Sequence, residues 1–391
     1  MRQRRNLFLL LILLCVNTLS AQIPEGYYDA ATGLSDSALK TALHRIIRGH
    51  HTISYNGLWT AFYNSDDKPN GKVWDMYSDN PDGTPPYEYE FGADQCSTTP
   101  GIENSCYNRE HSFPQSYFGS SSSDTVYTDL FQLYPTDSYV NTRRNNYPYG
   151  TVANPTWTSM NGSKVGPCSY QGYTGTVFEP LDAFKGDLAR TYFYIATRYE
   201  HSIPEWTTLS VYGNAILDST SFPCFEPWFL AMLMEWHEAD PVSQKETDRN
   251  NAVYALQGNR NPYIDHPEYV GLIWGGEEPV VLPEPTNYPA SFSAHSILLQ
   301  WQDATGTTVP DGYLIRMGTA GFNAIAAPED GVIYLGATDF IVPYGLQSFR
   351  VTNLSPQTTY YFKMFSFSGD GITINYKTDG SIPQTMQVTG P

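Results

Sequence analysis

The sequence has little positive charge for its length. Its 391 residues include 22 Lys and Arg against 40 Asp and Glu, which gives a formal net charge of −18. Proteins that bind nucleic acid tightly through bulk charge have a basic excess, so the composition excludes that class. Net charge affects encounter rate and solubility more than the chemistry of a site. A weak, salt-sensitive contact with a polyanion, through a local basic patch and a metal ion, therefore stays open.

Long apolar runs are also missing, apart from one near the N-terminus. Arginines within the first five residues precede the apolar run Leu7–Val16, and small and polar residues follow as far as Ala21. A membrane helix needs about 20 apolar residues, so this run is too short to span a bilayer. The pattern is typical of a secretory signal peptide. We predict a signal peptide over residues 1–21, a secreted or periplasmic protein and no membrane span; association with the cell surface stays open.

Cysteine is rare, and four cysteines remain after the predicted signal peptide: Cys96, Cys106, Cys168 and Cys224. An even number in an exported chain favours two disulfides, and four cysteines allow three pairings. We favour Cys96–Cys106, because the two are close in sequence, together with Cys168–Cys224. A zinc site is the weaker interpretation, because the sequence has no Cys-x-x-Cys pair.

Several catalytic motifs are absent. The sequence contains no Gly-x-Ser-x-Gly and no phosphate-binding loop, which argues against a serine hydrolase of that type and a P-loop nucleotide hydrolase. His237 and Glu238 resemble the start of a zinc-protease motif. Pro241 and Val242 follow where the second histidine would be needed, so the His-Glu-x-x-His pattern fails.

The first two thirds of the chain combine helices with loops. Apolar periodicity and end signals predict helices at about Asp36–Gly49, Asp187–Tyr199 and Pro227–Glu238. A further helix begins at Ser243, where Glu246 completes a capping box, and Gly258 ends it. We also predict a strand over Lys72–Tyr77 and an early helical turn over Ser138–Asn141, with Thr136 or Asp137 as its N-cap.

The composition changes near residue 276. Residues 276–290 are rich in Pro and Glu and are typical of a linker. The following residues contain short β-rich runs between turns. We expect strands at Ile297–Trp301, Gly312–Met317, Val332–Leu335 and Tyr360–Phe367. The predicted organisation is therefore a first domain over residues 22–275, a linker over 276–290 and an all-β domain over 291–391.

Four ordered blocks of residues resemble the bacterial endonuclease I family. The blocks are Asn108–Pro114 (NREHSFP), Asp129–Leu133 (DLFQL) with Asn141, Leu188–Tyr194 (LARTYFY) and Gly258–Tyr263 (GNRNPY). A Glu-His pair alone would be a weak signal, but four blocks in order are specific. The resemblance covers about residues 25–275.

The resemblance implies an α+β fold, a ββα-metal (His-Me finger) nuclease domain. In such a domain two strands hold the Glu110–His111 pair and a helix supplies Asn141. The resemblance makes His111 the general base, and Glu110 and Asn141 the ligands of one divalent cation. Mg²⁺ is the expected ion, with Mn²⁺ or Ca²⁺ as alternatives. It also implies a product with a 5′-phosphate.

The chemistry of these residue types agrees with that expectation. Phosphodiester hydrolysis needs an activated water and relief of negative charge at the phosphate. An imidazole near its ordinary pKa can accept the proton of the water at neutral pH. Carboxylate and amide oxygens suit a hard divalent cation. We therefore predict a secreted, metal-dependent endonuclease without sequence specificity. Its partner is nucleic acid, DNA with RNA as a second class, and no obligate protein partner is evident.

Some roles are harder to assign from sequence. Arg109 is a candidate for the catalytic centre, and Arg143 and Arg144 are candidates for binding phosphate, because all three lie near the expected metal in sequence. Neighbouring residues on a strand point to opposite faces, so Glu110 and His111 act together only if the strand bends or the site lies at its edge. Phe131 and Gln132 stand where the family pattern Asp-Leu-His-Asn-Leu has the histidine and the asparagine, which puts any role of that histidine in doubt.

The C-terminal residues resemble a fibronectin type III domain, which implies an all-β immunoglobulin-like sandwich. Trp301 ends one apolar strand, and Leu354–Tyr360 resembles the turn into a tyrosine corner. These aromatics are expected in the core of such a sandwich, and we find no catalytic cluster in this part of the sequence.

Two rival functions stay open. One is a metal phosphodiesterase that acts on small or lipid substrates, and the other is a surface-binding protein that has kept the fold without catalysis.

Overall fold

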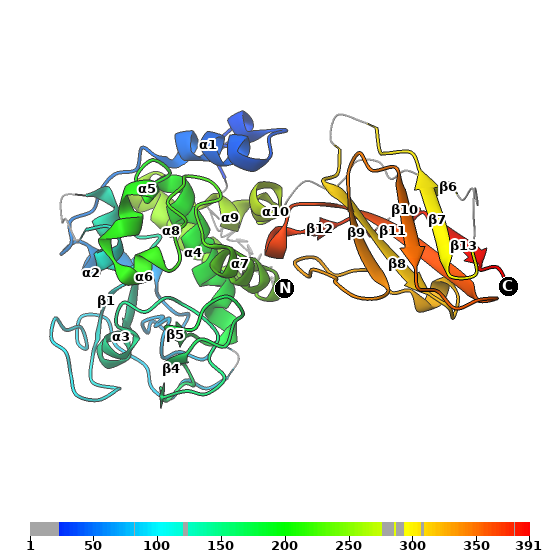
Figure 1. Cartoon of the computed structure of the whole chain (residues 1–391). Coiled ribbons are helices and arrows are strands. Elements are labelled where there is room, and N and C mark those ends of the chain that lie inside the picture. The colour runs from blue at the N-terminus through cyan, green and yellow to red at the C-terminus, as the bar shows by residue number, and fades with distance from the viewer. Residues whose placement is uncertain are drawn as a thin grey trace, which may run out of the picture.

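The computed structural model describes residues 23–81, 83–119, 124–275, 285–286, 293–305, 309–378 and 380–391. The predicted signal peptide and most of the predicted linker lie outside these residues. Figure 1 shows a mainly helical part beside a part built from long strands, with α10 and β12 near their junction. One large hydrophobic cluster fills the helical part, and smaller ones fill the strand part.

The helices of residues 23–275 pack around α4. Their bounds are α1 (Asp36–Ile47), α2 (Leu58–Ser65), α3 (Ser138–Arg144), α4 (Lys185–Arg198), α5 (Ile203–Trp206), α6 (Val211–Asn214), α7 (Pro227–Ala239), α8 (Gln244–Gln257), α9 (Pro262–Asp265) and α10 (Glu268–Trp274). Every residue of α4 after Lys185 is buried, and α1, α7 and α9 contact it. A helix buried all round is expected at the centre of a core.

The helices predicted from sequence are confirmed. On α1 the predicted apolar face is buried, with Leu39, Leu43 and Ile47 fully inaccessible. At the start of α8 the Ser243 side chain accepts from the Glu246 amide and the capping box is complete. Gly258 ends α8 in the left-handed region at φ 80°, where glycine has no steric cost.

Two small antiparallel sheets lie in the helical part. The first pairs β1 (Tyr107–His111) with β2 (Leu133–Asp137), in a register that sets Tyr107 opposite Asp137 and His111 opposite Leu133. The second contains β3 (Trp157–Thr158), β4 (Lys164–Pro167) and β5 (Thr176–Glu179). Helix α3 follows β2 without a loop, so the chain forms a strand–strand–helix unit.

The C-terminal part contains two antiparallel sheets. One has the order β10-β7-β6, with β6 (Pro285–Thr286), β7 (Ser296–Trp301) and β10 (Ser348–Thr352). The other is built from β8 (Gly312–Gly318), β9 (Asp339–Pro343), β11 (Thr359–Ser368), β12 (Asn375–Tyr376) and β13 (Gln384–Val388). Side chains of both sheets share one core, as in a β-sandwich.

Details of this sandwich agree with the predicted immunoglobulin-like architecture. Trp301 is buried at the end of β7. The Tyr360 hydroxyl accepts a hydrogen bond from the Ser355 amide at 2.9 Å, which is the contact of a tyrosine corner. Strand β6 pairs with β7, so residues 285 and 286 of the predicted linker lie against the sandwich.

Two predicted strands are wrong. Residues 72 and 73 form isolated bridges, after which the Asp75 carboxylate accepts from the Tyr77 amide at 2.8 Å and the chain turns. Residues 332–335 belong to no strand among the described residues, and Val332, Ile333 and Leu335 are exposed. Their apolar character suggested a buried strand, but they follow a turn and lie on the surface.

One of the two predicted disulfides is confirmed. Cys96 and Cys106 form a disulfide with Cα atoms 5.8 Å apart. The predicted Cys168–Cys224 bond is wrong, because both residues are free thiols in the described structure. Cys168 follows β4 beside the Tyr170 carbonyl, whereas Cys224 is buried near Lys40.

Among the described residues, no helix has both the length and the apolar character needed to cross a membrane.

Candidate active site

The strand–strand–helix unit positions the candidate catalytic residues. Asp137, the last residue of β2, is the N-cap of α3, and its Oδ1 accepts from the amides of Tyr139 and Val140 at 2.7 and 2.9 Å. The hydroxyl of Tyr89 donates to the other carboxylate oxygen at 2.6 Å. Because this cap fixes where α3 begins, it also fixes the direction in which Asn141 points, one turn further along.

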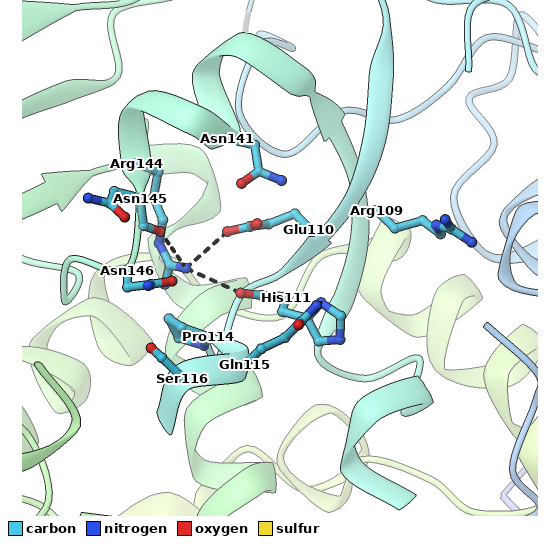
Figure 2. A pocket seen from close by; sticks show the side chains of 10 residues that line it. All are labelled: Arg109, Glu110, His111, Pro114, Gln115, Ser116, Asn141, Arg144, Asn145 and Asn146. Atoms are coloured by element: carbon cyan, nitrogen blue, oxygen red, sulfur yellow. Dashed lines mark hydrogen bonds and ion pairs between the residues drawn. The ribbon is translucent and has the colours of Figure 1, made fainter. Parts of the chain in front are cut away.

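A polar cavity of about 310 Å³ lies where β1 and α3 meet. The residues that line it are Arg109, Glu110, His111, Pro114, Gln115, Ser116, Asn141, Arg144, Asn145 and Asn146. In Figure 2 the side chains of Asn141 and Arg144 project from α3 toward Glu110, and Gln115 lies next to the His111 ring. Glu110, His111 and Asn141, which sequence reasoning singled out, therefore line one cavity.

Glu110 is a buried carboxylate beside the side chains of Tyr77, Arg144 and Asn141. Its Oε1 accepts from the Tyr77 hydroxyl at 2.9 Å and lies 3.1 Å from Nη1 of Arg144. Burial raises the pKa of Glu110 to about 7, although the charge of Arg144 acts in the opposite direction. The carboxylate is therefore short of positive charge, so a bound cation would stabilise its ionised form.

The Asn141 side chain lines the cavity beside Glu110. Its Nδ2 donates to Oδ1 of Asn108 at 2.9 Å, so the amide nitrogen is engaged on the strand side. Asn108 in turn donates to the Ser138 hydroxyl at 3.0 Å. This chain of hydrogen bonds orients the Asn141 amide. Oδ1 is then the atom of this side chain that can bind a cation.

The His111 imidazole is held in one orientation. Its Nε2 donates to the Tyr127 carbonyl at 2.9 Å, which makes Nδ1 the unprotonated nitrogen. Nε2 of Gln115 donates to that Nδ1 at 3.0 Å. Burial lowers the pKa of His111 to about 4, and the charges of Arg109 and Arg144 act in the same direction. The neutral ring therefore has a proton-accepting nitrogen at the cavity.

The end of β1 explains how neighbouring residues reach one cavity. Glu110 packs toward Tyr77 and Arg144, whereas the His111 ring lies near Tyr55 and Tyr127. The two side chains do leave the strand on different faces, as alternation requires. β1 ends at His111 and the cavity lies at this strand end, so both side chains line it.

The three arginines occupy different places. Arg144 is buried, and besides Glu110 it donates to the carbonyls of His111 and Ser112 at 3.2 and 2.6 Å. The Arg143 guanidinium is exposed 5.2 Å over the Trp157 ring, outside the cavity lining. The Arg109 guanidinium lies 3.6 Å over the Tyr55 ring and donates to the Tyr55 carbonyl. Figure 2 shows it pointing away from Glu110.

Sequence reasoning missed several supporting residues. One of them is Gln115, which lies four positions after His111. This short separation in sequence was the only indication that the two side chains could meet. Tyr77 comes from a distant segment, so nothing in the sequence linked it to Glu110. Phe131 stands at the position of the expected histidine and is buried. Its neighbour Gln132 is also buried, and Gln132 Nε2 donates to the Val126 carbonyl at 2.6 Å. It thereby supports the 3-10 turn Thr125–Thr128, whose Tyr127 carbonyl holds His111.

Comparison with known proteins identifies the family of this chain. The family model described as Endonuclease I matches residues 35–268, more than half of the chain. The chain belongs to the endonuclease I family. It is therefore an endonuclease, a hydrolase whose substrate is nucleic acid, in a family that is generally dependent on a divalent metal.

Two named relatives illustrate the range of this family. The chain is 35% identical to an extracellular ribonuclease of Bacillus amyloliquefaciens over 255 residues, which cover 64% of this chain and 78% of the relative. It is 26% identical to endonuclease-1 of Buchnera aphidicola subsp. Baizongia pistaciae over 140 residues, which cover 36% of this chain and 46% of that relative.

Solved structures match the sandwich part of the chain. The match to the fn3 domain of human contactin 1 covers 30% of this chain and 85% of that structure. The sequence identity is 16% and the TM-score is 0.21. A structure of the FN1–FN3 domains of chicken CNTN1 is 20% identical, covers 29% of this chain and 33% of its own, and has a TM-score of 0.22. The sandwich itself follows from the strand pairing of this chain.

Proposed function

We propose that this endonuclease is secreted and metal-dependent, and that it hydrolyses DNA and RNA without sequence specificity. One observation supports the proposal above all. Glu110, Asn141 and His111, whose Nδ1 is unprotonated, line the same cavity, from a strand end and the helix that follows its partner strand.

Glu110 and Asn141 would hold the metal ion. Their carboxylate and amide oxygens are the ligands that Mg²⁺ prefers, and a cavity this open leaves room for waters and a phosphate oxygen. The raised pKa of Glu110 also favours a cation, since its carboxylate is buried with only one positive neighbour. When bound, the ion would neutralise charge on the phosphate and stabilise the leaving oxygen.

His111 would act as the general base. Its Nδ1 would accept a proton from the attacking water, while the Tyr127 carbonyl keeps Nε2–H in place and stabilises the imidazolium that forms. The Gln115 amide occupies Nδ1 in the described structure, so it would yield this position to the water. The low pKa of His111 keeps the ring neutral at neutral pH, and it also makes the ring a weaker base than an imidazole of ordinary pKa.

Arg144 would act as a positioning residue. It contacts Glu110 and the carbonyls of His111 and Ser112, so one buried guanidinium fixes both halves of the site. Arg143, the residue before Arg144, is exposed. It can contact the nucleic acid backbone when the substrate approaches the site. The cavity lining adds amides and a hydroxyl from Gln115, Ser116 and Asn146, which suit phosphate oxygens. Phosphate contacts contain no sequence information, which supports cleavage without sequence specificity.

The substrate and the compartment are supported by the relatives. One is named an extracellular ribonuclease and another endonuclease-1, so we include both RNA and DNA. The N-terminal sequence pattern favours secretion, and so does the similarity to a ribonuclease that is named extracellular. A product with a 5′-phosphate remains an expectation from the family.

Digestion of three substrates with and without Mg²⁺ tests the proposal. Supercoiled plasmid, structured RNA and a small phosphodiester ester would be incubated with the mature protein in Mg²⁺ or in EDTA. We expect plasmid and RNA to be cut in Mg²⁺ and not in EDTA, with 5′-phosphates at the new ends. Cleavage of only the small ester, or full activity in EDTA, would contradict the proposal.

A further inference from the structure

A cluster of metal-binding side chains lies away from the catalytic cavity. His44 of α1 and the pair Glu200–His201, just after α4, bring one ligand atom each to within 4.8 Å of one another. None of these residues lines the catalytic cavity. We propose that this cluster is a second metal site, which binds Zn²⁺ and joins α1 to the C-terminal end of α4.

His44 is arranged as metal-bound histidines usually are. Its Nδ1 lies 3.0 Å from the Thr197 carbonyl and 3.1 Å from the Arg198 carbonyl, so Nδ1 bears the proton and donates it. Ligand histidines commonly donate one ring N–H to a backbone carbonyl in this way and bind the metal through the other nitrogen. The two carbonyls account only for Nδ1. Nε2 of His44 therefore remains available as a ligand.

Glu200 has a buried oxygen that needs a partner. Its Oε1 accepts from the Thr41 hydroxyl at 2.7 Å and lies 3.8 Å from the Lys40 ammonium. Its Oε2 is buried and has no hydrogen-bond partner among the described residues. Leaving a carboxylate oxygen buried and unpaired is costly, so an unpartnered oxygen on a carboxylate that lies beside two histidines indicates a missing ligand.

His201 completes the set from the solvent side. Its ring lies 4.8 Å, centroid to centroid, from the His44 ring in an edge-to-face arrangement. Ligand atoms around a tetrahedral zinc ion are roughly 3.3 Å apart, given bonds of about 2.0–2.1 Å. The exposed His201 side chain can make the small rotation needed to reach that spacing. Solvent would then supply the fourth ligand.

The ligand set and the surroundings favour zinc over magnesium. Two imidazoles with one carboxylate suit Zn²⁺, whereas Mg²⁺ prefers oxygen ligands. The carbonyls of Thr197 and Arg198 lie at the C-terminal end of α4, where the helix dipole favours a cation. The opposing charges are Lys40, which also donates to the Ser221 carbonyl, and Arg198.

Zinc titration of the untagged mature chain tests this site. The protein would be stripped with a chelator and titrated calorimetrically with Zn²⁺ in excess Mg²⁺, which occupies oxygen sites. His201→Ala removes an exposed ligand and should leave the fold intact. We expect it to weaken binding of one Zn²⁺ at least about 10-fold, because even an outer partner of a ligand has an effect of that size.

A matched control is His266→Ala, which removes a histidine 3.0 Å from a glutamate outside the cluster. This variant should bind Zn²⁺ as the wild type does. Zn²⁺ should also raise the thermal unfolding midpoint of the wild type and the control, but not that of His201→Ala. Equal zinc affinity in all three proteins, or no shift in the midpoint of the wild type, would overturn the proposal. Neither result depends on nuclease activity.

Discussion

The helical nuclease part and the sandwich are stabilised in different ways. The core of the nuclease part contains buried charges, among them Arg144, Arg190 and Arg249, each paired with a carboxylate. In the sandwich, the buried polar residues among those described are serines and one threonine: Ser296, Ser366, Ser368 and Thr389. Its ion pair between Arg316 and Asp339 is partly exposed.

This difference follows from what each part has to position. A buried ion pair gains little over a well-packed apolar pair, so it contributes more to placement than to stability. Arg249 connects Asp66 with the carbonyls of Leu130 and Leu133, at the start of β2. Arg144 likewise connects α3 with β1. The nuclease part uses buried charges to place the strands of its candidate site, whereas the described cores of the sandwich are built mainly from apolar side chains.

Among the substitutions that test this comparison, Arg190→Met is expected to have the largest effect on stability. Arg190 forms two hydrogen bonds with Glu246, at 2.6 and 2.8 Å, and both side chains are buried. Removing one partner of such a pair leaves an uncompensated charge, so we expect a loss of about 3–5 kcal/mol in the free energy of unfolding. Urea denaturation followed by tryptophan fluorescence measures this. A loss below about 1 kcal/mol would show that the buried pair is dispensable.

Asn141→Ala tests whether the helix of the nuclease part supplies a metal ligand. We expect the Mg²⁺ concentration needed for half-maximal plasmid cleavage to rise at least about 10-fold, since loss of a ligand costs no less than loss of its outer partner. Thr142→Ala, the next residue on α3, is the matched control, because Thr142 is exposed and bonds only within its helix. Identical Mg²⁺ dependence in both variants would exclude Asn141 as a ligand.

Arg316→Met sharpens the comparison from the sandwich side. Its guanidinium lies 2.8 Å from Asp339, but both side chains are about one sixth exposed. Partly solvated pairs contribute little, so we expect the free energy of unfolding of the sandwich to fall by about 1 kcal/mol or less. The denaturation experiment used for Arg190→Met applies. A loss as large as that of Arg190→Met would mean that both parts depend equally on their charges.

Removal of residues 276–391 should have the smallest effect on catalysis. The cavity is lined only by residues between Arg109 and Asn146. The sandwich touches the nuclease part elsewhere: Asn375 donates to the Gly275 carbonyl at 2.9 Å, and the 3-10 turn Gly371–Thr373 packs beside α7. We expect unchanged kcat/KM on plasmid DNA for the truncated protein. A large fall in kcat/KM with an intact fold would assign the sandwich a part in substrate binding.

Sequence patterns predicted those features of the fold that depend on residues close together in the chain. Capping signals gave the limits of α8, and the apolar face of α1 was evident from its spacing. In the sandwich, alternation gave β7, β8 and β11, but an apolar surface loop at residues 332–335 was mistaken for a strand. Periodicity reports apolar character, and it cannot distinguish a buried strand from an exposed loop.

Contacts between distant segments could not be predicted in this way. Glu110, His111 and Asn141 were found because their blocks resemble a known family. The Tyr77 contact to Glu110 spans 33 residues and depends on the folded chain. Burial of Arg144 was also hidden, since a pair of arginines at a helix end is usually solvated. The polar core of the nuclease part is therefore the region where sequence reasoning was weakest.

We propose that a cation and the His111 imidazole act together on one phosphate while performing separate tasks. Mg²⁺ affinity by calorimetry and single-turnover cleavage of plasmid DNA would be measured for wild type, Glu110→Ala and His111→Ala. We predict that Glu110→Ala loses both metal binding and cleavage. His111→Ala should keep the wild-type Mg²⁺ affinity and cleave at least ~100-fold more slowly. Wild-type cleavage by either variant would contradict the account.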